Sequence, residues 1–326
     1  TAVGTNALDA NTTGELNVAV GENALGANTT ASRNTAVGRY SLVVNTTGAD
    51  NTALGNSALQ ENTTAANNTA IGSYCLDANT TGAQNTAVGK SAMSASTTGA
   101  DNTAVGFSAI GNGTNGGSGR QCAFGYAALQ AVTTGNTNNC FGFEAGRSLT
   151  TGSWNVAIGG ESLEENSGGS GNIAIGHDAL RYYSGNYNVA IGFQAMSAAS
   201  STGASNTAVG YHALLSNTDG TQNVAIGHGS LDANTGGDNN TAVGYGALTT
   251  NTTYGNHTAV GYGALSACST GQENTAFGSN CMGAMSSGNY NDAFGRDALG
   301  AGTGYSQCCA FGNSALKVNT GNDNTA

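Results

Sequence analysis

Proline is absent from the 326 residues, and charged residues make up only 8% of them. About a quarter of the residues of an ordinary globular domain are charged, so this composition argues against a typical globular enzyme. Only eight Lys and Arg stand against nineteen Asp and Glu, a net charge of -11. That balance excludes the basic face that nucleic-acid binding needs. Long apolar runs are also missing, so no segment could span a bilayer.

Glycine is abundant, with 52 residues, and it marks an internal repeat. The stretch Asn240 to Leu265, "NTAVGYGALTTNTTYGNHTAVGYGAL", states nearly the same phrase twice. We use the Gly that ends each NTAVG-like phrase as a ruler glycine. The ruler glycines recur every 17 residues, with single steps of 19, 16 and 18, at Gly4, Gly21, Gly38, Gly55, Gly72, Gly89, Gly106, Gly125, Gly142, Gly159, Gly176, Gly192, Gly210, Gly227, Gly244, Gly261, Gly278, Gly295 and Gly312. The repeat predicts one array over 1–326, with a Gly-rich insertion at 111–120.

Each unit has a fixed pattern around its ruler glycine. The residue before it is always Val, Ile, Leu or Phe, and the residue four after it is Leu, Met or Ile in eighteen units. Val156 and Ile158 lie two apart, which predicts a strand whose branched side chains face the core. A second short strand is expected around the "ALxA" segment that contains Leu163. The segment "NTTG" predicts a turn, because Asn, Thr and Gly favour turns.

The predicted fold is therefore all-β, a parallel β-solenoid of about nineteen coils, each hydrogen-bonded to its neighbours. The core of such a coil is thin. Burial of two or three apolar side chains must offset the backbone entropy that seventeen residues lose on folding. We therefore expect lateral association of chains through their Ala faces, or end-to-end stacking through open sheet edges. The sequence starts and stops inside a repeat, which suggests a segment of a longer chain or fibre.

The phrases "NVAIG" at Asn155, Asn188 and Asn223, with "NIAIG" at Asn172, resemble the repeats in heads of bacterial trimeric autotransporter adhesins. The fuller form "NTAVGxxAL…NTTG" is similar to shaft repeats of bacterial and phage tail-fibre-like surface proteins. The resemblance covers the whole chain, although the "NTTG" turn makes the unit longer than in the adhesins. It implies a left-handed β-roll, usually trimeric, that works as a passive stalk or adhesive surface outside the cell.

Sequons for N-glycosylation are the clearest candidate sites. Those that begin "NTT" share one phase of the repeat, at Asn11, Asn28, Asn45, Asn62, Asn79 and Asn251. Further N-x-Thr sequons begin at Asn67, Asn112, Asn239 and Asn256. Glycans on an outward turn would keep a weakly charged protein soluble. The alternative is that Asn and Thr are simply good turn and ladder residues.

Aromatic residues directly follow the ruler glycine in seven units, at Phe107, Tyr126, Phe143, Phe193, Tyr211, Tyr245 and Tyr262. Their common phase predicts an aromatic ladder in which rings stack between coils. Rows of this kind could also stack on sugar rings or bind a partner protein.

No catalytic, cofactor or metal site is predicted. The match "GNGTNG" to G-x-G-x-x-G at 111–116 lacks the strand before it and the helix after it that dinucleotide binding needs. His177 and His228 share a phase three coils apart, too far to share a metal ion. The seven cysteines are mostly interpreted as small buried residues, and their disulfide state stays open. Glu161, Glu164 and Glu165 cluster, which we interpret as a solvated turn.

These observations favour a non-enzymatic, extracellular or cell-surface structural fibre or adhesin shaft that self-associates and carries glycans. One alternative is an ice-binding solenoid, although the Thr three before the ruler glycine is often replaced by Val, Ile, Cys or Asp. Another alternative is a carbohydrate-binding phage tail-fibre segment; if it also processed its carbohydrate, it would need a pair of carboxylates in a groove.

Overall fold

A computed structural model describes residues 1–113, 119–199 and 201–326 of the chain. In these residues every regular element is a β-strand. The chain divides into two compact units, Thr1–Gly168 and Gly169–Ala326, and each is described by itself. Part of the Gly-rich insertion, at 114–118, lies outside the described residues.

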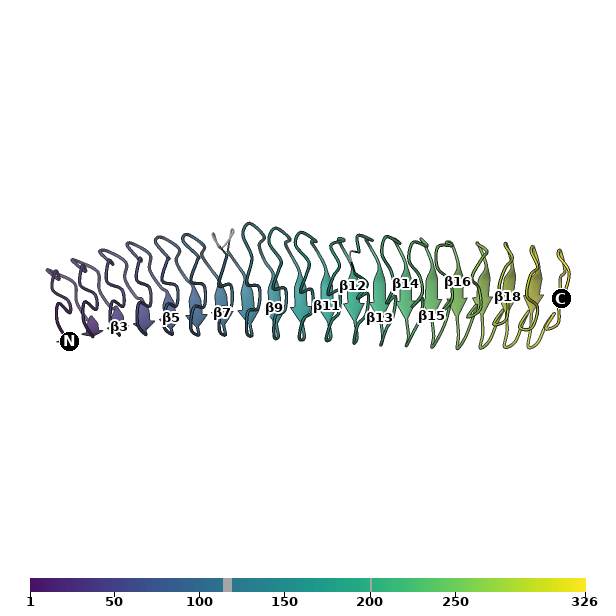
Figure 1. Ribbon diagram of the computed structural model, residues 1–326, viewed down its shortest axis with the longest axis horizontal. Helices are drawn as coiled ribbons and strands as arrows, with labels where there is room; N and C mark the ends of the chain where they lie inside the picture. The colour runs from purple at the N-terminus through teal and green to yellow at the C-terminus, as the bar shows by residue number, and fades with distance from the viewer. Residues whose placement is uncertain (114–118, 200) are drawn as a thin grey trace. The chain divides into compact units, whose positions relative to one another are not determined.

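Each unit is a parallel β-solenoid, so the predicted fold class is confirmed (Figure 1). The strands of the first unit are β1 (Ala2–Val3), β2 (Val18–Val20), β3 (Thr35–Val37), β4 (Thr52–Leu54), β5 (Thr69–Ile71), β6 (Thr86–Val88), β7 (Thr103–Val105), β8 (Cys122–Phe124), β9 (Asn139–Phe141) and β10 (Val156–Ile158). Those of the second unit are β11 (Ile173–Ile175), β12 (Val189–Ile191), β13 (Thr207–Val209), β14 (Val224–Ile226), β15 (Thr241–Val243), β16 (Thr258–Val260), β17 (Thr275–Phe277), β18 (Asp292–Phe294) and β19 (Cys309–Phe311).

Each strand is parallel to the next strand along the chain within its unit. The register follows the repeat, so that equivalent residues pair; Thr52 lies beside Thr69, and Ala53 beside Ala70. The same pairing holds from β11 to β19 in the second unit, where Thr241 pairs with Thr258. Equivalent residues of successive coils therefore form rows that run from coil to coil.

The strands turn their small residue inwards. The middle residue, such as Ala19 or Ala157, is fully buried, whereas Val156 is half-buried and Ile158 is exposed. The prediction that the branched pair faces the core is therefore wrong. The core is instead filled by the middle Ala, the Ala three after the ruler glycine and the Leu that follows it, for example Ala19, Ala24 and Leu25.

The predicted second strand around "ALxA" is a turn. Leu25 in this segment has a φ of 51°, a left-handed conformation that costs an L-residue about 1–2 kcal/mol. Full burial of the leucine side chain contributes about 1.5–3 kcal/mol and offsets that strain. The amide N–H of Leu25 donates to Ser41 O of the next coil at 3.0 Å, so coils are bonded here as well.

Glycine is required at the ruler position for two reasons, the backbone conformation there and the short distance to the next coil. Gly21 has a φ of 134°, which L-residues rarely adopt, and a Cβ on it would lie 2.6 Å from Gly38 O of the next coil. The left-handed conformation and the close approach of the next coil therefore both require glycine here.

Two rows of asparagine close coils from the inside, the first nearly continuous and the second present in ten of the nineteen units. The closing position is four residues before the ruler glycine, and the turn position is seven after it. In one coil, Asn34 and Asn45 occupy these positions, and each donates from Nδ2 to Gly48 O at 2.9 Å. Asn34 Oδ1 also accepts from the backbone N–H of Asn51 in the next coil at 2.9 Å. These buried amides satisfy backbone groups that a narrow coil could not pair otherwise.

Candidate functional site

The sequons that begin "NTT" occupy the turn position, and their asparagines point inwards. Asn28, Asn45, Asn62, Asn79 and Asn251 are fully buried, and Asn11 in the first coil is half-buried. Their amides form a ladder; Asn62 Nδ2 donates to Asn45 Oδ1 at 2.9 Å and to Ala65 O at 3.0 Å.

The expectation that these side chains line the outside is therefore wrong for the five buried asparagines. The reason is that the turn leaves carbonyl groups inside the coil, and an asparagine amide is the donor that pairs with them. A glycan on any of the five would have to break the ladder.

The remaining sequons lie at other positions. Asn67, Asn239 and Asn256 are exposed, five residues before a ruler glycine, with φ values of 60°, 56° and 63°. Asn112 is exposed too, but Thr114 of its sequon lies outside the described residues. Glycosylation at these four sites stays a prediction.

The position directly after the ruler glycine forms a row of stacked rings, which we call the ring row. In the first unit, the ring centroids of Phe107 and Tyr126 are 5.4 Å apart, and those of Tyr126 and Phe143 are 5.3 Å apart. The planes within each pair differ by no more than 10°. These three rings were predicted from their phase to form a ladder.

The ring row of the second unit contains six rings, because two histidines complete it. His177 stacks on Phe193 at 5.8 Å, and His228 lies between Tyr211 and Tyr245 at 4.9 and 5.0 Å. The stack also joins Phe193 to Tyr211 at 5.5 Å and Tyr245 to Tyr262 at 5.4 Å. Sequence reasoning missed the part played by these histidines, although their shared phase was the signal that could have shown it.

The first and third residues of every strand point outwards and form a second surface, the outer sheet face. Its third position carries Val, Ile, Leu or Phe in every strand but the two-residue β1, where Val3 is the last residue. About half of these side chains are exposed, such as Ile158 at 41%, and the others, such as Val37 and Ile175, are half-buried. Among the strand residues of the described chain, Asp292 is the only charged one. The face is therefore almost uncharged, with an apolar row at the third position beside a first row in which Thr is the commonest residue. Sequence reasoning missed the apolar row because it placed these side chains inside.

Phenylalanines on the outer sheet face stack in the same way as the rings of the ring row. Phe124 and Phe141 have centroids 5.2 Å apart in the first unit. Phe277, Phe294 and Phe311 follow one another in the second unit at 5.2 and 4.9 Å. Stacking between coils leaves the outer edges of these rings pointing to solvent.

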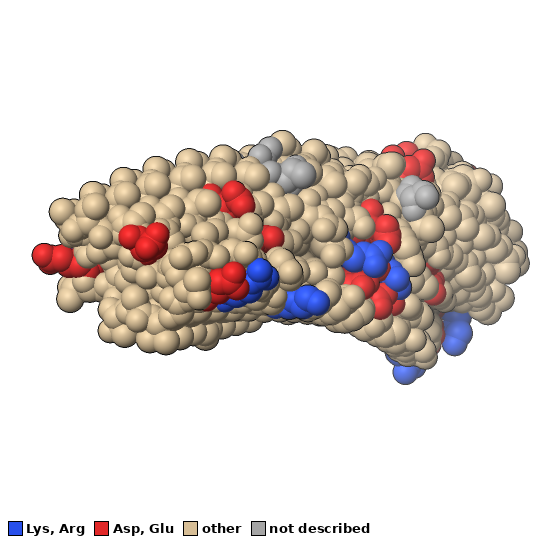
Figure 2. Space-filling model, turned by 60° about the vertical axis from the view of Figure 1, so that its left-hand side comes forward, with Lys and Arg blue, Asp and Glu red and all other residues tan. Residues whose placement is uncertain are grey.

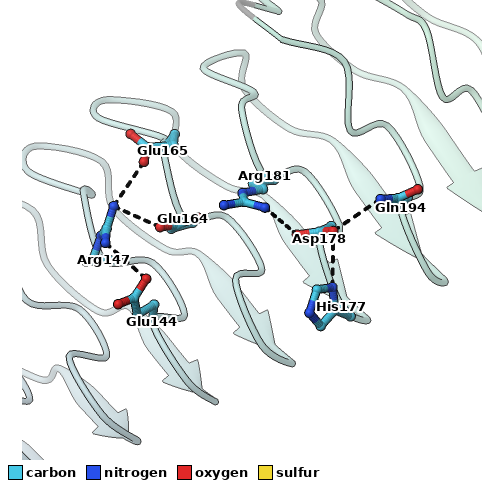
Figure 3. A network of polar contacts seen from close by, with 8 residues as sticks. All are labelled: Glu144, Arg147, Glu164, Glu165, His177, Asp178, Arg181 and Gln194. Carbon is cyan, nitrogen blue, oxygen red and sulfur yellow. Dashed lines mark hydrogen bonds and ion pairs between the residues drawn. The ribbon is translucent and has the colours of Figure 1, made fainter.

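Charged side chains gather in a few clusters, and most of the face seen in Figure 2 is neither acidic nor basic. In the first unit, Arg147 contacts Glu144 at 3.0 Å, Glu164 at 2.8 Å and Glu165 at 3.1 Å (Figure 3). Two of the glutamates that sequence analysis placed in a solvated turn are thus partners of an arginine, and Glu164 is almost fully buried.

A similar cluster in the second unit is centred on Asp178. Its carboxylate contacts Arg181 at 3.1 Å, His177 at 3.1 Å and Gln194 at 3.2 Å (Figure 3). The contact with Gln194 crosses from one coil to the next. The carboxylates of Glu164 and Asp178 are buried and the arginines that contact them are half-buried, so both clusters are best explained as ties within and between coils.

The cysteines are all free thiols. Five are buried, and burial raises the pKa of the Cys75 and Cys140 thiols to about 12, which makes them poor nucleophiles. The two half-buried ones, Cys122 and Cys309, both lie on the outer sheet face. Within the described residues, no group of three or more His, Cys, Asp and Glu side chains could hold a metal ion.

No helix among the described residues is long and apolar enough to cross a membrane. No protein-family model matches the chain, and a search of curated proteins found no relative. The resemblance to adhesin heads and tail-fibre shafts therefore stays a prediction from the repeat phrases.

Proposed function

We propose that the protein is a non-enzymatic structural shaft, outside the cell or on its surface, whose chains associate through the outer sheet face. The observation that carries this proposal is the row of Val, Ile, Leu and Phe side chains at the third strand position, which are exposed or half-buried and continue from coil to coil with no charged member. Contiguous apolar patches of this length are uncommon on monomeric proteins and mark interaction sites.

The area of the face is that of a small contact. A strip nine coils long at about 4.8 Å per coil, and about 10 Å wide for a three-residue strand, covers roughly 400 Å². Each unit carries one such strip, about half of the roughly 800 Å² that each partner contributes to a stable complex. The thin cores support association, because it would bury the side chains that the coils leave outside.

A second copy of the chain is the partner that fits best. The outer sheet face has ridges that repeat at the coil spacing, and only a surface with the same spacing can match them over many coils. The net charge of -11 lies on other faces and opposes contact there. Threefold assembly and left-handed coils are part of the proposal through the resemblance to adhesin heads.

Oligomeric state tests the proposal. Wild-type protein is expected to sediment as an oligomer in analytical ultracentrifugation at micromolar concentration. The double variant Ile71→Lys and Ile226→Lys, with one charge on each strip, should sediment as a monomer of native circular dichroism. The matched control Ser73→Lys and Ser279→Lys adds the same charges in the ring row, where Lys90 already stands, and should stay oligomeric. A monomeric wild type would refute the proposal.

Glycans are a further part of the proposal, and they are now restricted to exposed sequons. Asn67, Asn239 and Asn256 are exposed and lie outside the strands, so a sugar there would not have to break the buried ladder.

Ice binding is a second candidate, favoured by one observation. Thr35, Thr52, Thr69, Thr86 and Thr103 pair in register over β3–β7 and point outwards, each two residues from an outward aliphatic side chain. Other residues replace Thr at this position elsewhere in the chain, but the row of Thr is continuous over these five coils. Purified protein should then show thermal hysteresis that Thr69→Lys reduces, and its absence would remove this candidate.

A further inference from the structure

The asparagine ladder that starts in the first coil ends at Asn79. In this ladder each Nδ2 donates to the Oδ1 of the preceding coil, as Asn62 Nδ2 does to Asn45 Oδ1 at 2.9 Å. Asn79 Nδ2 continues the pattern with Asn62 Oδ1 at 3.0 Å. The turn position of the next coil is Ser96, and that of the coil after it is Gly113. Neither residue carries an amide, so the ladder supplies no donor to Asn79 Oδ1.

Two fully buried polar atoms lie in successive coils at the end of the ladder. Asn79 and Ser96 are both 0% exposed, and neither Asn79 Oδ1 nor Ser96 Oγ has a hydrogen-bond partner among the described residues. Buried polar groups of native proteins almost always have a partner, which is either protein or ordered water. Two unpaired groups in adjacent coils therefore point to a bound molecule.

A backbone carbonyl is available as a third partner. Ala65 O accepts from two side-chain amides, those of Asn62 at 3.0 Å and Asn51 at 2.9 Å. The equivalent carbonyl two coils further along is Gly99 O. In the described chain it accepts from one side-chain amide, that of Asn85 at 2.8 Å. A carbonyl oxygen has two lone pairs, so Gly99 O can accept a second hydrogen bond.

The two acceptors at the end of the ladder face one point. A Cβ on Gly82 would collide with both Asn79 Oδ1 and Gly99 O, so the two oxygens lie close together. Gly48 has the corresponding two oxygens beside it where the ladder is complete, and there one asparagine Nδ2 donates to both. A donor at the corresponding point beside Ser96 would therefore serve Asn79 Oδ1 and Gly99 O together.

We propose that a water molecule binds at this point and takes the place of the missing amide. Its two O–H groups donate to Asn79 Oδ1 and Gly99 O, and its oxygen accepts from the Ser96 hydroxyl. Three hydrogen bonds are the usual number for a buried water. Serine is two heavy atoms smaller than asparagine, which leaves room for about one water, roughly 30 Å³. A cation is disfavoured, because none of the three ligands carries a charge to pair with it.

The bound water should exchange slowly with solvent. It lies among fully buried side chains, so it leaves only when a coil opens. The site lies inside one unit of a single chain, so the inference goes beyond the structural shaft and does not depend on association.

High-resolution crystallography of the full chain tests the position of the water. Density should appear about 2.7–3.2 Å from Asn79 Oδ1, Ser96 Oγ and Gly99 O. In Ser96→Asn, the new Nδ2 should replace the water and donate to the same two oxygens.

Relaxation dispersion of water ¹⁷O tests the same site in solution, because it counts long-lived buried waters. Ser96→Asn should hold one fewer than the wild type. The matched control Ser73→Asn adds the same atoms in the ring row, where Asn56 stands in the preceding coil, and should leave the count unchanged. Circular dichroism of both variants separates these results from loss of the fold, and the wild-type density decides the question even if Ser96→Asn does not fold.

Four results would each overturn the proposal: no density at this point, a direct hydrogen bond from Ser96 Oγ to Asn79 Oδ1, equal water counts in the wild type and Ser96→Asn, or an equal loss in Ser73→Asn. Ligand distances of about 2.3–2.6 Å are typical of calcium. They would show a bound cation and would overturn it as well.

Discussion

Single buried polar residues hold each coil closed, and His257 is the one that titrates. It replaces asparagine at the closing position and makes equivalent contacts: its backbone N–H donates to Asn240 Oδ1 at 3.0 Å, and its Nε2 lies 2.9 Å from Gly271 O. Nδ1 faces the backbone N–H of Asn274 at 3.4 Å. These contacts require a neutral ring with Nε2 protonated, because Nδ1 must accept.

Acid should therefore weaken the coil of His257. Burial lowers the pKa of His257 to about 4, from 6.5 in the unfolded chain. The unfolded state binds a proton first as the pH falls, so stability from this residue is complete above pH 6.5 and declines down to about pH 4. The loss is about 3 kcal/mol at about 1.4 kcal/mol per pH unit.

Urea unfolding at pH 7, 5.5 and 4 measures this effect. His257→Asn restores the asparagine that is usual at the closing position. The variant should lose about 3 kcal/mol less unfolding free energy than the wild type between pH 7 and pH 4. The exposed-histidine control His228→Asn should behave as the wild type does. Equal acid sensitivity in the wild type and His257→Asn would show that the buried imidazole is not responsible.

The asparagine ladder gives a second prediction for single residues. Asn62→Ala leaves Asn45 Oδ1 without its donor; Ala65 O keeps the Asn51 amide as a donor, and the Asn79 amide keeps Gly82 O as an acceptor. A buried group left unpaired costs about 1–3 kcal/mol, so the variant should lose about that much unfolding free energy. Asn67→Ala, at an exposed position, should change stability by less than about 0.5 kcal/mol.

The same pair of asparagines separates the two interpretations of the sequons. After secretion from a glycosylating host, mass spectrometry should find glycan on Asn67 and none on Asn62, because only the first amide is accessible in the folded coil. Glycan on Asn62 in natively folded protein would contradict the buried ladder.

At the scale of the element, the ruler glycine sets how closely coils approach. Gly72 has a φ of 141°, and a Cβ there would collide with Gly89 O of the next coil. Gly72→Ala is therefore expected to destabilise the protein by several kcal/mol in thermal or urea unfolding, through both strain and separation of the coils. Gly168→Ala is the control and should be nearly neutral, because its φ lies outside the left-handed range and a Cβ there would lie 3.4 Å from its nearest neighbour, Thr151 Oγ1.

How far sequence predicts such elements depends on what a repeat can reveal. Spacing located every strand, because a row of equivalent residues must recur at each ruler glycine. It could not show which face of a three-residue strand is buried, since shifting by one residue exchanges the faces. Val156 and Ile158 were assigned to the core as the larger apolar residues, whereas the narrow coil admits only Ala157.

The same limit applies to the polar sites. Asn45 was expected outside because free asparagine prefers water, but the unpaired carbonyl groups of the turn draw it inside. The ring row was predictable from phase alone, since stacking needs only equal position in adjacent coils. His228 was missed because histidine was considered as a metal ligand and not as a flat ring.

At the scale of the whole molecule, charge is distributed so that one surface is left for contact. The strand residues carry a single charge, Asp292, while other acidic side chains and all the basic ones lie off the outer sheet face. An apolar face with charged surroundings favours association in one orientation, because contact elsewhere would bring acidic surfaces together.

Asp292 is therefore the residue at which association is opposed most. Burying its carboxylate against an apolar partner removes its hydration without supplying a cation, so part of the energy gained from the apolar contacts is lost. Asp292→Asn removes the charge and keeps the size of the side chain. The variant should associate more tightly, by about tenfold in the dissociation constant, which corresponds to about 1.4 kcal/mol.

Sedimentation equilibrium over a dilution series measures the change. Asp101→Asn removes an equal charge from an exposed position outside the strands, five residues before a ruler glycine, and serves as the control. If association depended only on net charge, both variants would tighten it equally. A larger effect of Asp292→Asn, weakly dependent on salt, would locate the contact on the strands, because a buried charge is screened little while exposed charges are screened within about 10 Å at 0.1 M salt.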